Sequence, residues 1–476
     1  MKFHIINISF STGIFPLELK IAKVLPLYKS GESSLFSNYR PVSVLPAISK
    51  IFEKLLYQKL LSFVNRHNIL YAFQFGFREL HSPGIALIML VDKISKALEE
   101  GDFVLGLFLD FSKAFDTVNH DILFKKLEFY GIQGTALELC KSYLSNRYQY
   151  VEYNDAVSRK ERIVCGVPQG SILGPLLFLI YINDLPHASS KIFSILFADD
   201  SNLFLSGKNP NELIQIMNTE ISYIYDWLQV NKLSINLKKT HYMIFRKRRQ
   251  KINITQDLKI NDVVIDQIDK TKFLGVVIDP FLSFSEHIKY VKGKISRGLG
   301  ILYRGKRVLN KKTMVTLYNV FIYPYFMYCI EVWGNTCQSY LDPLIKIQKR
   351  AVRVISFAKR LDHTDPLFLN TRILKTKEIY IYSVQLFMFK FHNYKLPQVI
   401  YSLFTRNDTI HDHSTRQHNK LHVPLSKIQL TSTSVRTTGV LLYNHFYDIL
   451  DMNCSYYTYK KKLKQYLLDN EITLLL

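Results

Sequence analysis

Three aspartates stand where short apolar segments end, and their carboxylates could hold a metal ion. Asp110 closes the run VLGLFLD, and Asp199 and Asp200 interrupt FSILFADDSNLFLSG. The first run is short and almost wholly apolar, which favours a buried strand, whereas the second indicates strand, tight turn and strand. If these strands lie side by side, ionised carboxylates ~4 Å apart repel by roughly 4 kcal/mol per pair at an effective dielectric of ~20. A divalent cation would relieve that repulsion.

Magnesium suits such a cluster because it binds through a couple of carboxylates, waters and substrate phosphate oxygens. Two ions ~3.5–4 Å apart would activate an attacking hydroxyl and stabilise a leaving pyrophosphate. A lone Asp-Asp turn, however, is more often a solvated hairpin corner, so the neighbouring residues have to decide between the two interpretations.

Two neighbouring segments point to a nucleotide. Phe115 follows Asp110 by five residues, and its ring could press on a sugar and exclude a 2′-hydroxyl; the alternative is a core phenylalanine. The loop from Gly166 to Ser171 lets backbone approach a flat ligand, and Gln169 can donate and accept hydrogen bonds. The alternative for this loop is a helix-entry turn with Ser171 near a cap position.

The elements that must carry these residues follow from periodicity. Apolar spacing predicts helices over residues 47–68, 85–100, 120–130 and 212–229, a hairpin over 147–164, and a strand over 273–278. Further on, residues 287–307 and 340–360 predict basic helices. Their positive faces could be merely solvated or could grip nucleic acid.

Composition limits the class of protein. The 476 residues suggest two to four packed units, and 48% hydrophobic with 21% charged residues argues for a globular chain. The net charge of +23 favours a polyanionic partner, first of all nucleic acid. Five scattered cysteines without a CxxC pair argue against disulfides and zinc knuckles and for a reducing intracellular setting. The His-rich window 405–422 is a surface loop in which zinc is only weakly indicated.

No membrane or export segment is indicated. The longest apolar run, residues 172–182, is interrupted by Gly174 and Pro175 and is too short to span a bilayer. The start MKFHIINISFSTG lacks the pattern of a signal peptide. We expect no membrane partner and a nuclear or cytoplasmic location, with RKRRQK at 246–251 either a nuclear signal or a solvated loop.

In their order, several segments carry a family resemblance. FLDFSKAFDTVNHDIL, GVPQGSILGPLLF, FADD, LSINLKKT and FLGVVID resemble the successive palm motifs of reverse transcriptases, above all those of jockey-like non-LTR (LINE-type) retrotransposons. LPLYKSGES, NYRPVSVL and QFGFR resemble the fingers motifs of the same enzymes. The region from Ser285 through IQKRAVRVI resembles their thumb and connection, and SVRTTGVLLYNHF with YKKKLKQYLL resembles their tail. The resemblance covers nearly the whole chain, and the order of five motifs makes it specific.

The resemblance implies an α+β right-hand polymerase with an antiparallel-sheet palm. Fingers and palm would occupy residues 1–280, a helical thumb and connection 281–370, and a C-terminal helical tail region 371–476. The implied activity is RNA-directed DNA polymerisation, in which a DNA 3′-hydroxyl is extended on an RNA template. Deoxynucleotide triphosphates would be the substrates, and two Mg²⁺ ions, with Mn²⁺ as a substitute, would be the cofactors.

Carried over residue by residue, the resemblance makes Asp110, Asp199 and Asp200 the metal-site carboxylates. Asp110 and Asp199 would be the principal ligands, and the backbone carbonyl of Phe111 would add an oxygen. Phe115 would be the steric gate that selects deoxynucleotides.

The same comparison implies a nucleotide and primer surface. Lys29 and Arg40 would hold the incoming triphosphate, for which the bidentate geometry of arginine is suited. Lys239 would approach the leaving pyrophosphate, although Lys238 is an alternative. Gln169 would lie near the nascent base pair. Gly166 and Gly170 would lie along the primer and template, and Gly275 would belong to the turn that positions the primer.

The chain departs from the family pattern in two places. Pro83 stands where the family commonly has threonine; because proline fits a first helical turn, we expect only a small local change. No endonuclease or gag-like segment is visible before the fingers, which suggests a truncated or domesticated copy, or a gene model that contains only the later part of such an element. A non-catalytic nucleic-acid-binding remnant is therefore the alternative function. An RNA-templated RNA polymerase is a third, against which Phe115 argues.

Overall fold

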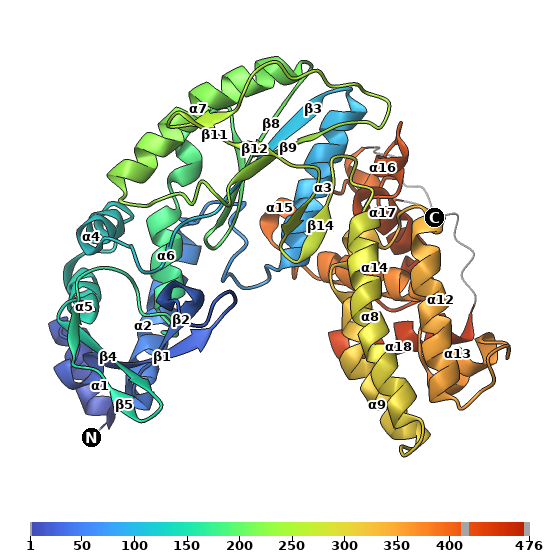
Figure 1. The fold of residues 1–476 in the computed structure, drawn as a ribbon, viewed down its shortest axis with the longest axis horizontal. Coiled ribbons are helices and arrows are strands. Elements are labelled where there is room, and N and C mark those ends of the chain that lie inside the picture. Colours follow the sequence, from blue (N-terminus) through green and yellow to red (C-terminus); the bar gives the residue numbers. More distant parts are fainter. Residues whose placement is uncertain (1, 411–417, 471–476) are drawn as a thin grey trace.

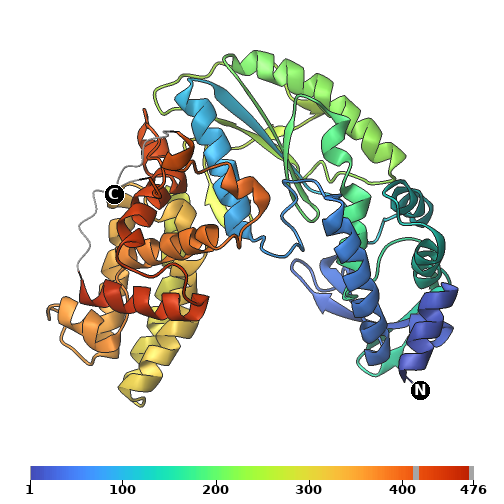
Figure 2. The same cartoon turned by 180° about the vertical axis from the view of Figure 1, so that it is seen from behind.

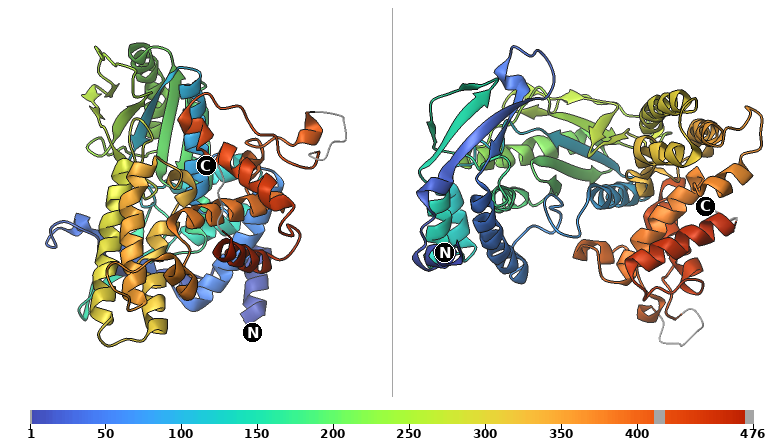
Figure 3. Two further views of the ribbon diagram at one scale, coloured as in Figure 1. Left: turned by 90° about the vertical axis from the view of Figure 1, so that its right-hand side faces the viewer. Right: turned by 90° about the horizontal axis from the view of Figure 1, so that it is seen from below.

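The computed structural model describes residues 2–410 and 418–470, whose ribbon forms an arch (Figure 1). One limb contains the amino-terminal elements, the other contains the helices that follow residue 284, and a sheet lies at the top between them. Figure 3 shows the hairpin of β1 (Ile21–Tyr28) and β2 (Tyr39–Val44) standing out from the body of the molecule.

The sheet between the limbs has the strand order β12-β9-β3-β8-β7. Its strands are β3 (Phe103–Leu109), β7 (Phe193–Phe197), β8 (Asp200–Gly207), β9 (His241–Phe245) and β12 (Asp266–Gln267). β3 is antiparallel to both β8 and β9, and only the short β12 runs parallel to its neighbour. All seven residues of β3 are buried, so the predicted buried strand is confirmed.

The sheet separates two hydrophobic cores because its side chains alternate between its faces. Val104 and Phe108 of β3 join the core that includes α3 (Pro83–Glu99), whereas Leu105 and Leu107 join the core that includes α6 (Gly174–Ile182) and α7 (Pro210–Val230). Figure 2 shows α3 between the sheet and the carboxyl-terminal helices. β3 is apolar throughout because both of its faces are covered.

Pro83 lies in the first turn of a helix, as we predicted from the sequence. α3 begins at Pro83, and the Ser82 hydroxyl accepts a hydrogen bond from the Ile85 N–H at 3.3 Å as its N-cap. The proline occupies a position whose N–H would have no helical partner anyway.

The amino-terminal limb combines a second sheet with helices. β1 pairs with β2 antiparallel and with β4 (Arg147–Tyr153) parallel, and β4 also pairs with β5 (Ala156–Val157) and β6 (Glu161–Ile163). Its helices are α1 (Lys2–Thr12), α2 (Ala47–Arg66), α4 (His120–Phe129) and α5 (Gly134–Leu144). The predicted helices over 47–68 and 120–130 and the hairpin over 147–164 are confirmed.

The other limb is helical. After the hairpin of β13 (Thr271–Phe273) and β14 (Val276–Ile278), its longer helices are α8 (Ser285–Gly305), α9 (Lys311–Phe321), α12 (Gln338–Ile355), α14 (Thr376–His392), α17 (Val435–Tyr447) and α18 (Tyr456–Asp469). Short helices α10 (Tyr323–Met327), α11 (Ile330–Trp333), α13 (Asp365–Thr371), α15 (Gln398–Tyr401) and α16 (Gln429–Ser432) join them.

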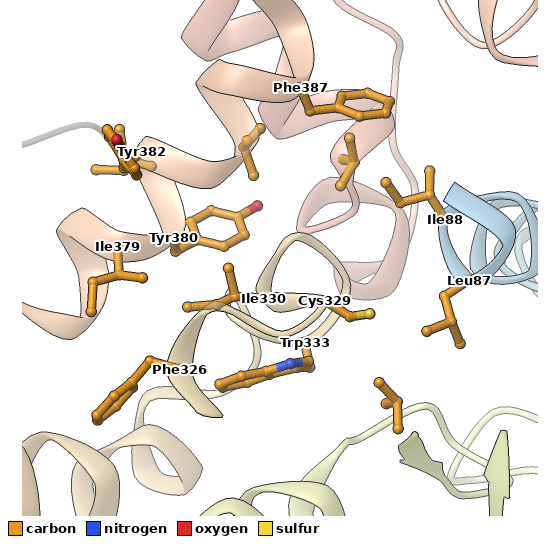
Figure 4. Close-up of a cluster of buried hydrophobic side chains, with 14 of the residues drawn as sticks. Leu87, Ile88, Phe326, Cys329, Ile330, Trp333, Ile379, Tyr380, Tyr382 and Phe387 are labelled. Atoms are coloured by element: carbon orange, nitrogen blue, oxygen red, sulfur yellow. The ribbon is translucent and has the colours of Figure 1, made fainter. Parts of the chain in front are cut away.

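These helices share one core with α3. Figure 4 shows Trp333 and Ile330 of α11 between Tyr380 of α14 and Leu87 of α3. Residues on both sides of position 370 contribute to this core, so the helices before and after that position pack together. None of the helices in the described ranges has both the length and the apolar character that crossing a bilayer requires.

The prediction of a single strand over 273–278 is wrong. Leu274 and Gly275 have positive φ values of 44° and 84°, so the chain reverses there and forms the β13–β14 hairpin. A residue 54 positions further along the chain stabilises this turn: the Tyr328 hydroxyl donates a 2.8 Å hydrogen bond to the Leu274 carbonyl.

Candidate active site

The β7–β8 turn brings Asp199 and Asp200 beside the end of β3. The β3–β8 ladder runs from Phe103 opposite Gly207 to Leu109 opposite Ser201. One more step in this register places Asp110 opposite Asp200, on strands that are ~4.8 Å apart. The three predicted carboxylates, which come from separate segments, therefore meet at one end of the sheet.

The electrostatics agree with this proximity. Desolvation by the surrounding protein, followed by the charges of Asp199 and Asp110, raises the pKa of Asp200 to about 6. Desolvation and then the Asp110 charge also raise the pKa of Asp199, against the lowering effect of its own backbone N–H, Arg40 and Lys29. Since both hairpin carboxyls remain accessible to solvent, an added cation could reach them.

The LSINLKKT segment lies along the other side of this strand end. The Asn236 N–H donates to the Asp110 carbonyl at 2.7 Å, and the Ser112 N–H donates to the Ser234 carbonyl at 2.8 Å. Lys239 Nζ lies 3.9 Å from Asp110 Oδ2. Of the two lysines considered from the sequence, Lys239 is therefore the one that reaches the carboxylates.

The same pairing orients the backbone of Phe111. Phe111 faces Ile235 in an isolated antiparallel bridge whose hydrogen bonds are made by the residues on either side. In such a pair the N–H and C=O of the central residue point away from the partner strand. The Phe111 carbonyl is thus directed to the side of the sheet on which the β7–β8 turn lies.

Phe115 is held at the edge of the protein interior. Its ring stacks on Phe178 with centroids 4.3 Å apart at 26°, and the ring of Phe77 meets it edge-on at 6.2 Å and 90°. Phe178 is fully buried, whereas Phe115 is half-buried. The ring is therefore fixed in place and still partly accessible, as a gate requires.

The Gly166–Ser171 loop is hydrogen-bonded both to Asp116, which follows Phe115, and to β2. Gln169 Nε2 donates to Asp116 Oδ1 at 2.8 Å, and the Gln169 carbonyl accepts from the Ser43 N–H at 2.7 Å. At Gly166 (φ +85°) an added Cβ would lie 2.7 Å from the Asp116 carbonyl oxygen. At Gly170 (φ +107°) it would lie 2.7 Å from that of Ser43. Both glycines thus permit close approach to the protein's own backbone.

The alternative interpretation of the Gly166–Ser171 loop, a helix-entry turn with Ser171 near a cap position, also has support. The Ser171 hydroxyl accepts from the Gly174 N–H at 3.0 Å at the entry to α6. The segment is therefore both a helix entry and the carrier of Gln169.

The β1–β2 hairpin carries one cation and the residues just after β1 carry another, and both lie within electrostatic range of Asp199. Leu27 pairs with Arg40, and because side chains alternate along a strand, Lys29 lies on the same face as Arg40. Both are exposed, and the positive charges of both lower the pKa of Asp199. The predicted triphosphate ligands therefore lie near the predicted metal ligands.

Gly275 lies in the β13–β14 turn, as predicted. An added Cβ there would lie 2.8 Å from the Tyr328 ring, so the turn tolerates no larger residue without movement. The part of this turn in positioning a primer stays a prediction.

Sequence reasoning recognised QFGFR as a motif but gave none of its residues a role. Gln74 Oε1 accepts hydrogen bonds from the Ala198 N–H at 3.0 Å and the Gly76 N–H at 2.9 Å. Ala198 has φ +57°, a left-handed conformation that costs an L-residue roughly 1–2 kcal/mol. Gln74 therefore supports the turn that carries Asp199.

Two weaker predictions have different outcomes. In the His-rich window, His411 and His413 lie outside the described residues. Within the described ranges, no three His, Cys, Asp or Glu side chains, Asp110, Asp199 and Asp200 included, are gathered closely enough to bind a metal by themselves. In RKRRQK, the guanidinium groups of Arg246 and Arg248 lie 4.8 and 5.9 Å from the centroid of the Phe281 ring, so part of the run packs onto the protein.

Comparison with known proteins finds matches over much of the chain. Residues 28–278 match the family model described as reverse transcriptase (RNA-dependent DNA polymerase). The chain is 30% identical over 352 residues to the probable RNA-directed DNA polymerase from transposon X-element of Drosophila melanogaster, covering 72% of this chain and 38% of that protein. It is 27% identical over 381 residues to the RNA-directed DNA polymerase from mobile element jockey of Drosophila funebris, with coverage of 77% and 40%.

A solved structure also matches in part. Apo telomerase from Candida tropicalis aligns at 11% identity with a TM-score of 0.43, over 79% of this chain and 66% of that one.

The chain spans only part of the length of its Drosophila relatives: 38% of the X-element protein and 40% of the jockey protein.

Proposed function

Because this chain belongs to the reverse transcriptase (RNA-dependent DNA polymerase) family, we propose that it extends a DNA 3′-hydroxyl on an RNA template as a non-LTR retrotransposon polymerase. The observation that carries this proposal is the register that sets Asp110 opposite Asp200, with Lys29 and Arg40 close to Asp199. We further propose fingers and palm over residues 1–280, a thumb over 281–370 and a tail region over 371–476.

The carboxylates fit a hard divalent cation. Desolvation, and after it the charges of Asp199 and Asp110, raises the pKa of Asp200 to about 6, and a bound cation would lower it again. Asp110 and Asp199 would be the principal ligands, and because magnesium takes its remaining oxygens from water and phosphate, a complete protein cage is not required. Two Mg²⁺ ions, or Mn²⁺ in their place, would supply activation of the attacking hydroxyl and stabilisation of the leaving pyrophosphate.

The remaining side chains would orient the substrate. Arg40 and Lys29 would hold the triphosphate, and Lys239, 3.9 Å from Asp110, would supply positive charge on the opposite side. Phe115 would exclude a ribonucleotide by contact with its 2′-hydroxyl. Gln169, fixed by its bond to Asp116, would contact the nascent base pair.

The nucleic acid would be held by the basic helices. α8 and α12 bury apolar residues such as Ile288 and Leu344 on the inner face and expose cations on the outer face. The exposed cations include Lys289, Lys292, Arg297, Lys346, Lys349 and Arg350. On a chain of net charge +23, these faces would bind a template–primer duplex, inside the nucleus or cytoplasm where RNA and target DNA are found.

The proposal is tested by primer extension on poly(rA)/oligo(dT) with purified protein. Wild type should incorporate deoxythymidine, the double change Asp199→Ala/Asp200→Ala should not, and Asp226→Ala, an exposed aspartate of α7, should behave as wild type. Salt-sensitive duplex binding without incorporation by the wild type would select the non-catalytic alternative.

A further inference from the structure

We propose that Gln74 and Gly76 are positioning residues that fix the Ala198–Asp199 turn relative to Asp110. The inference rests on the proposed polymerase function. The two residues that it names are neither proposed metal ligands nor proposed nucleotide-binding residues.

The segment that contains them is joined to the edge of the central sheet. β7 is the outermost strand on its side of that sheet. Gln74 forms a parallel bridge with Leu196, the Phe75 N–H donates to the Leu196 carbonyl at 2.8 Å, and the Leu196 N–H donates to the Phe73 carbonyl at 3.0 Å. The backbone of this fingers segment therefore continues the palm sheet directly beside the carboxylate hairpin.

The Gln74 amide then reaches past the strand to the turn itself. Its Oε1 accepts from two backbone N–H groups, those of Ala198 and Gly76, and only an oxygen can do this, so the amide orientation is fixed. Gln74 is 1% exposed. Without its oxygen, both N–H groups would be left buried without an acceptor, and the turn would lose the contact that opposes its relaxation.

Gly76 makes this contact sterically feasible. A Cβ on Gly76 would lie 2.2 Å from the Ala198 nitrogen and 2.9 Å from its Cα, so any side chain would displace the turn. Ala198 is already held in a left-handed conformation at φ +57°. Asp199 follows it directly, which means that a shift of Ala198 moves a proposed metal ligand.

The same segment also reaches the gate. Phe77 meets the Phe115 ring edge-on at 6.2 Å. Residues 74–77 thus contact both the carboxylate turn and the ring that faces the sugar, and they set the spacing between the two.

The experiment compares variants at position 74 by single-turnover extension on a pre-bound template–primer. Gln74→Met keeps the length but removes the acceptor, and Gln74→Glu keeps acceptor oxygens. We expect Gln74→Met to lower the extension rate constant about 100-fold, the loss typical of a misplaced reacting group, while burst amplitude and template–primer Kd stay unchanged. Burial beside Asp199 would keep the carboxyl introduced by Gln74→Glu protonated and neutral, so this variant retains a carbonyl acceptor and should recover most of that rate. Gly76→Ala should resemble Gln74→Met.

A matched control is Gln348→Met. Gln348 is also 1% exposed and donates to the Leu374 carbonyl and the Tyr318 hydroxyl, but it lies in the helical core. It should lower Tm and leave the rate constant per active molecule unchanged. If Gln74→Met likewise reduced only Tm and amplitude, or if Gln74→Glu were as slow as Gln74→Met, the positioning role would be contradicted.

Hydrogen exchange gives a readout that needs no activity. Gln74→Met should speed amide exchange in the peptide that covers residues 194–203, whereas Gln348→Met should not. An inactive wild type would end the proposed function but leave this comparison intact. Unchanged exchange in an active enzyme would overturn the inference alone.

Discussion

The side-chain amide of Gln169 donates a 2.8 Å hydrogen bond to the carboxylate of Asp116, the residue directly after Phe115. This bond joins the Gly166–Ser171 loop to the gate segment, and because Nε2 is used for it, the amide oxygen of Gln169 is left for a ligand. Desolvation raises the pKa of Asp116, while Gln169 and Lys113 lower it. The proposed gate residue Phe115 and the proposed base-pair contact Gln169 therefore lie on two segments that this hydrogen bond joins.

A first prediction concerns the gate. Phe115→Ala should reduce the preference for dTTP over UTP, expressed as the ratio of kcat/KM values, by roughly 10- to 100-fold, because the ring no longer blocks a 2′-hydroxyl. Steady-state extension with each nucleotide measures it. Phe129→Ala, at a ring that is 82% exposed on α4, is the control and should keep the wild-type ratio. An unchanged ratio in Phe115→Ala would mean that the Phe115 ring only packs against the protein and does not select the nucleotide.

A second prediction concerns the triphosphate. Arg40→Gln should raise the KM for dTTP roughly 10-fold, which is the value of a lost charge-assisted hydrogen bond, with little change in template–primer affinity. The KM is measured by varying dTTP at saturating template–primer. Arg159→Gln changes another exposed arginine, 89% exposed in its side chain and paired with Glu161, beyond β5. Equal effects of the two changes would mean that Arg40 acts only through net charge.

A third prediction concerns the β13–β14 turn. Gly275→Ala should destabilise the protein by on the order of 1–3 kcal/mol, since φ +84° disfavours an L-residue and its Cβ would meet Tyr328. Gly293→Ala, on α8 with nothing near an added Cβ, should instead stabilise the helix by about 0.5–1 kcal/mol. Urea unfolding distinguishes the two. If the turn also positions the primer, Gly275→Ala will slow extension more than its loss of stability explains.

A fourth prediction is a pH dependence of stability. Burial, and secondarily the Lys272 charge, lowers the pKa of His287 from 6.5 to about 4, and its Nδ1 accepts from the Val277 N–H. Between these values the unfolded state binds the proton that the folded state excludes, so stability is full above pH 6.5 and falls as the pH drops toward 4. The loss at pH 5 is about 2 kcal/mol.

His287→Asn removes this titrating group and keeps an acceptor at the position of Nδ1. The free energy of unfolding of the variant should therefore fall about 2 kcal/mol less than that of wild type between pH 7 and pH 5. Parallel curves for the two proteins would show that His287 has the same pKa in the folded and unfolded states.

The elements that periodicity determines could be predicted from the sequence. β3 is buried on both faces, so its continuous apolar run predicts a buried strand. The strand–turn–strand pattern around Asp199 is formed by residues that are close together in the sequence, so it could be predicted as well. The order of the motifs identified the carboxylates, and the register then placed Asp110 opposite Asp200.

What was not predictable depends on contacts between distant residues. The turn at Leu274 is stabilised by Tyr328, and leucine gives no local signal for a positive φ. The bond from Ala198 to Gln74 spans 124 positions, so no pattern within QFGFR shows what it supports. Likewise, the sequence does not show which of Lys238 and Lys239 lies near Asp110, whereas the structure places Lys239 Nζ 3.9 Å from Asp110 Oδ2.

The central claim is that Asp110 and the hairpin carboxylates act as one site, and a double-mutant cycle tests it most directly. Single-turnover extension is measured for wild type, Asp110→Ala, Asp199→Ala and the double variant. Residues that act as a unit are strongly non-additive, so each single change should lower the rate constant by about 10⁴-fold or more and the double change should add almost nothing. Additive losses, or an Asp110→Ala enzyme that extends at near the wild-type rate, would contradict the account.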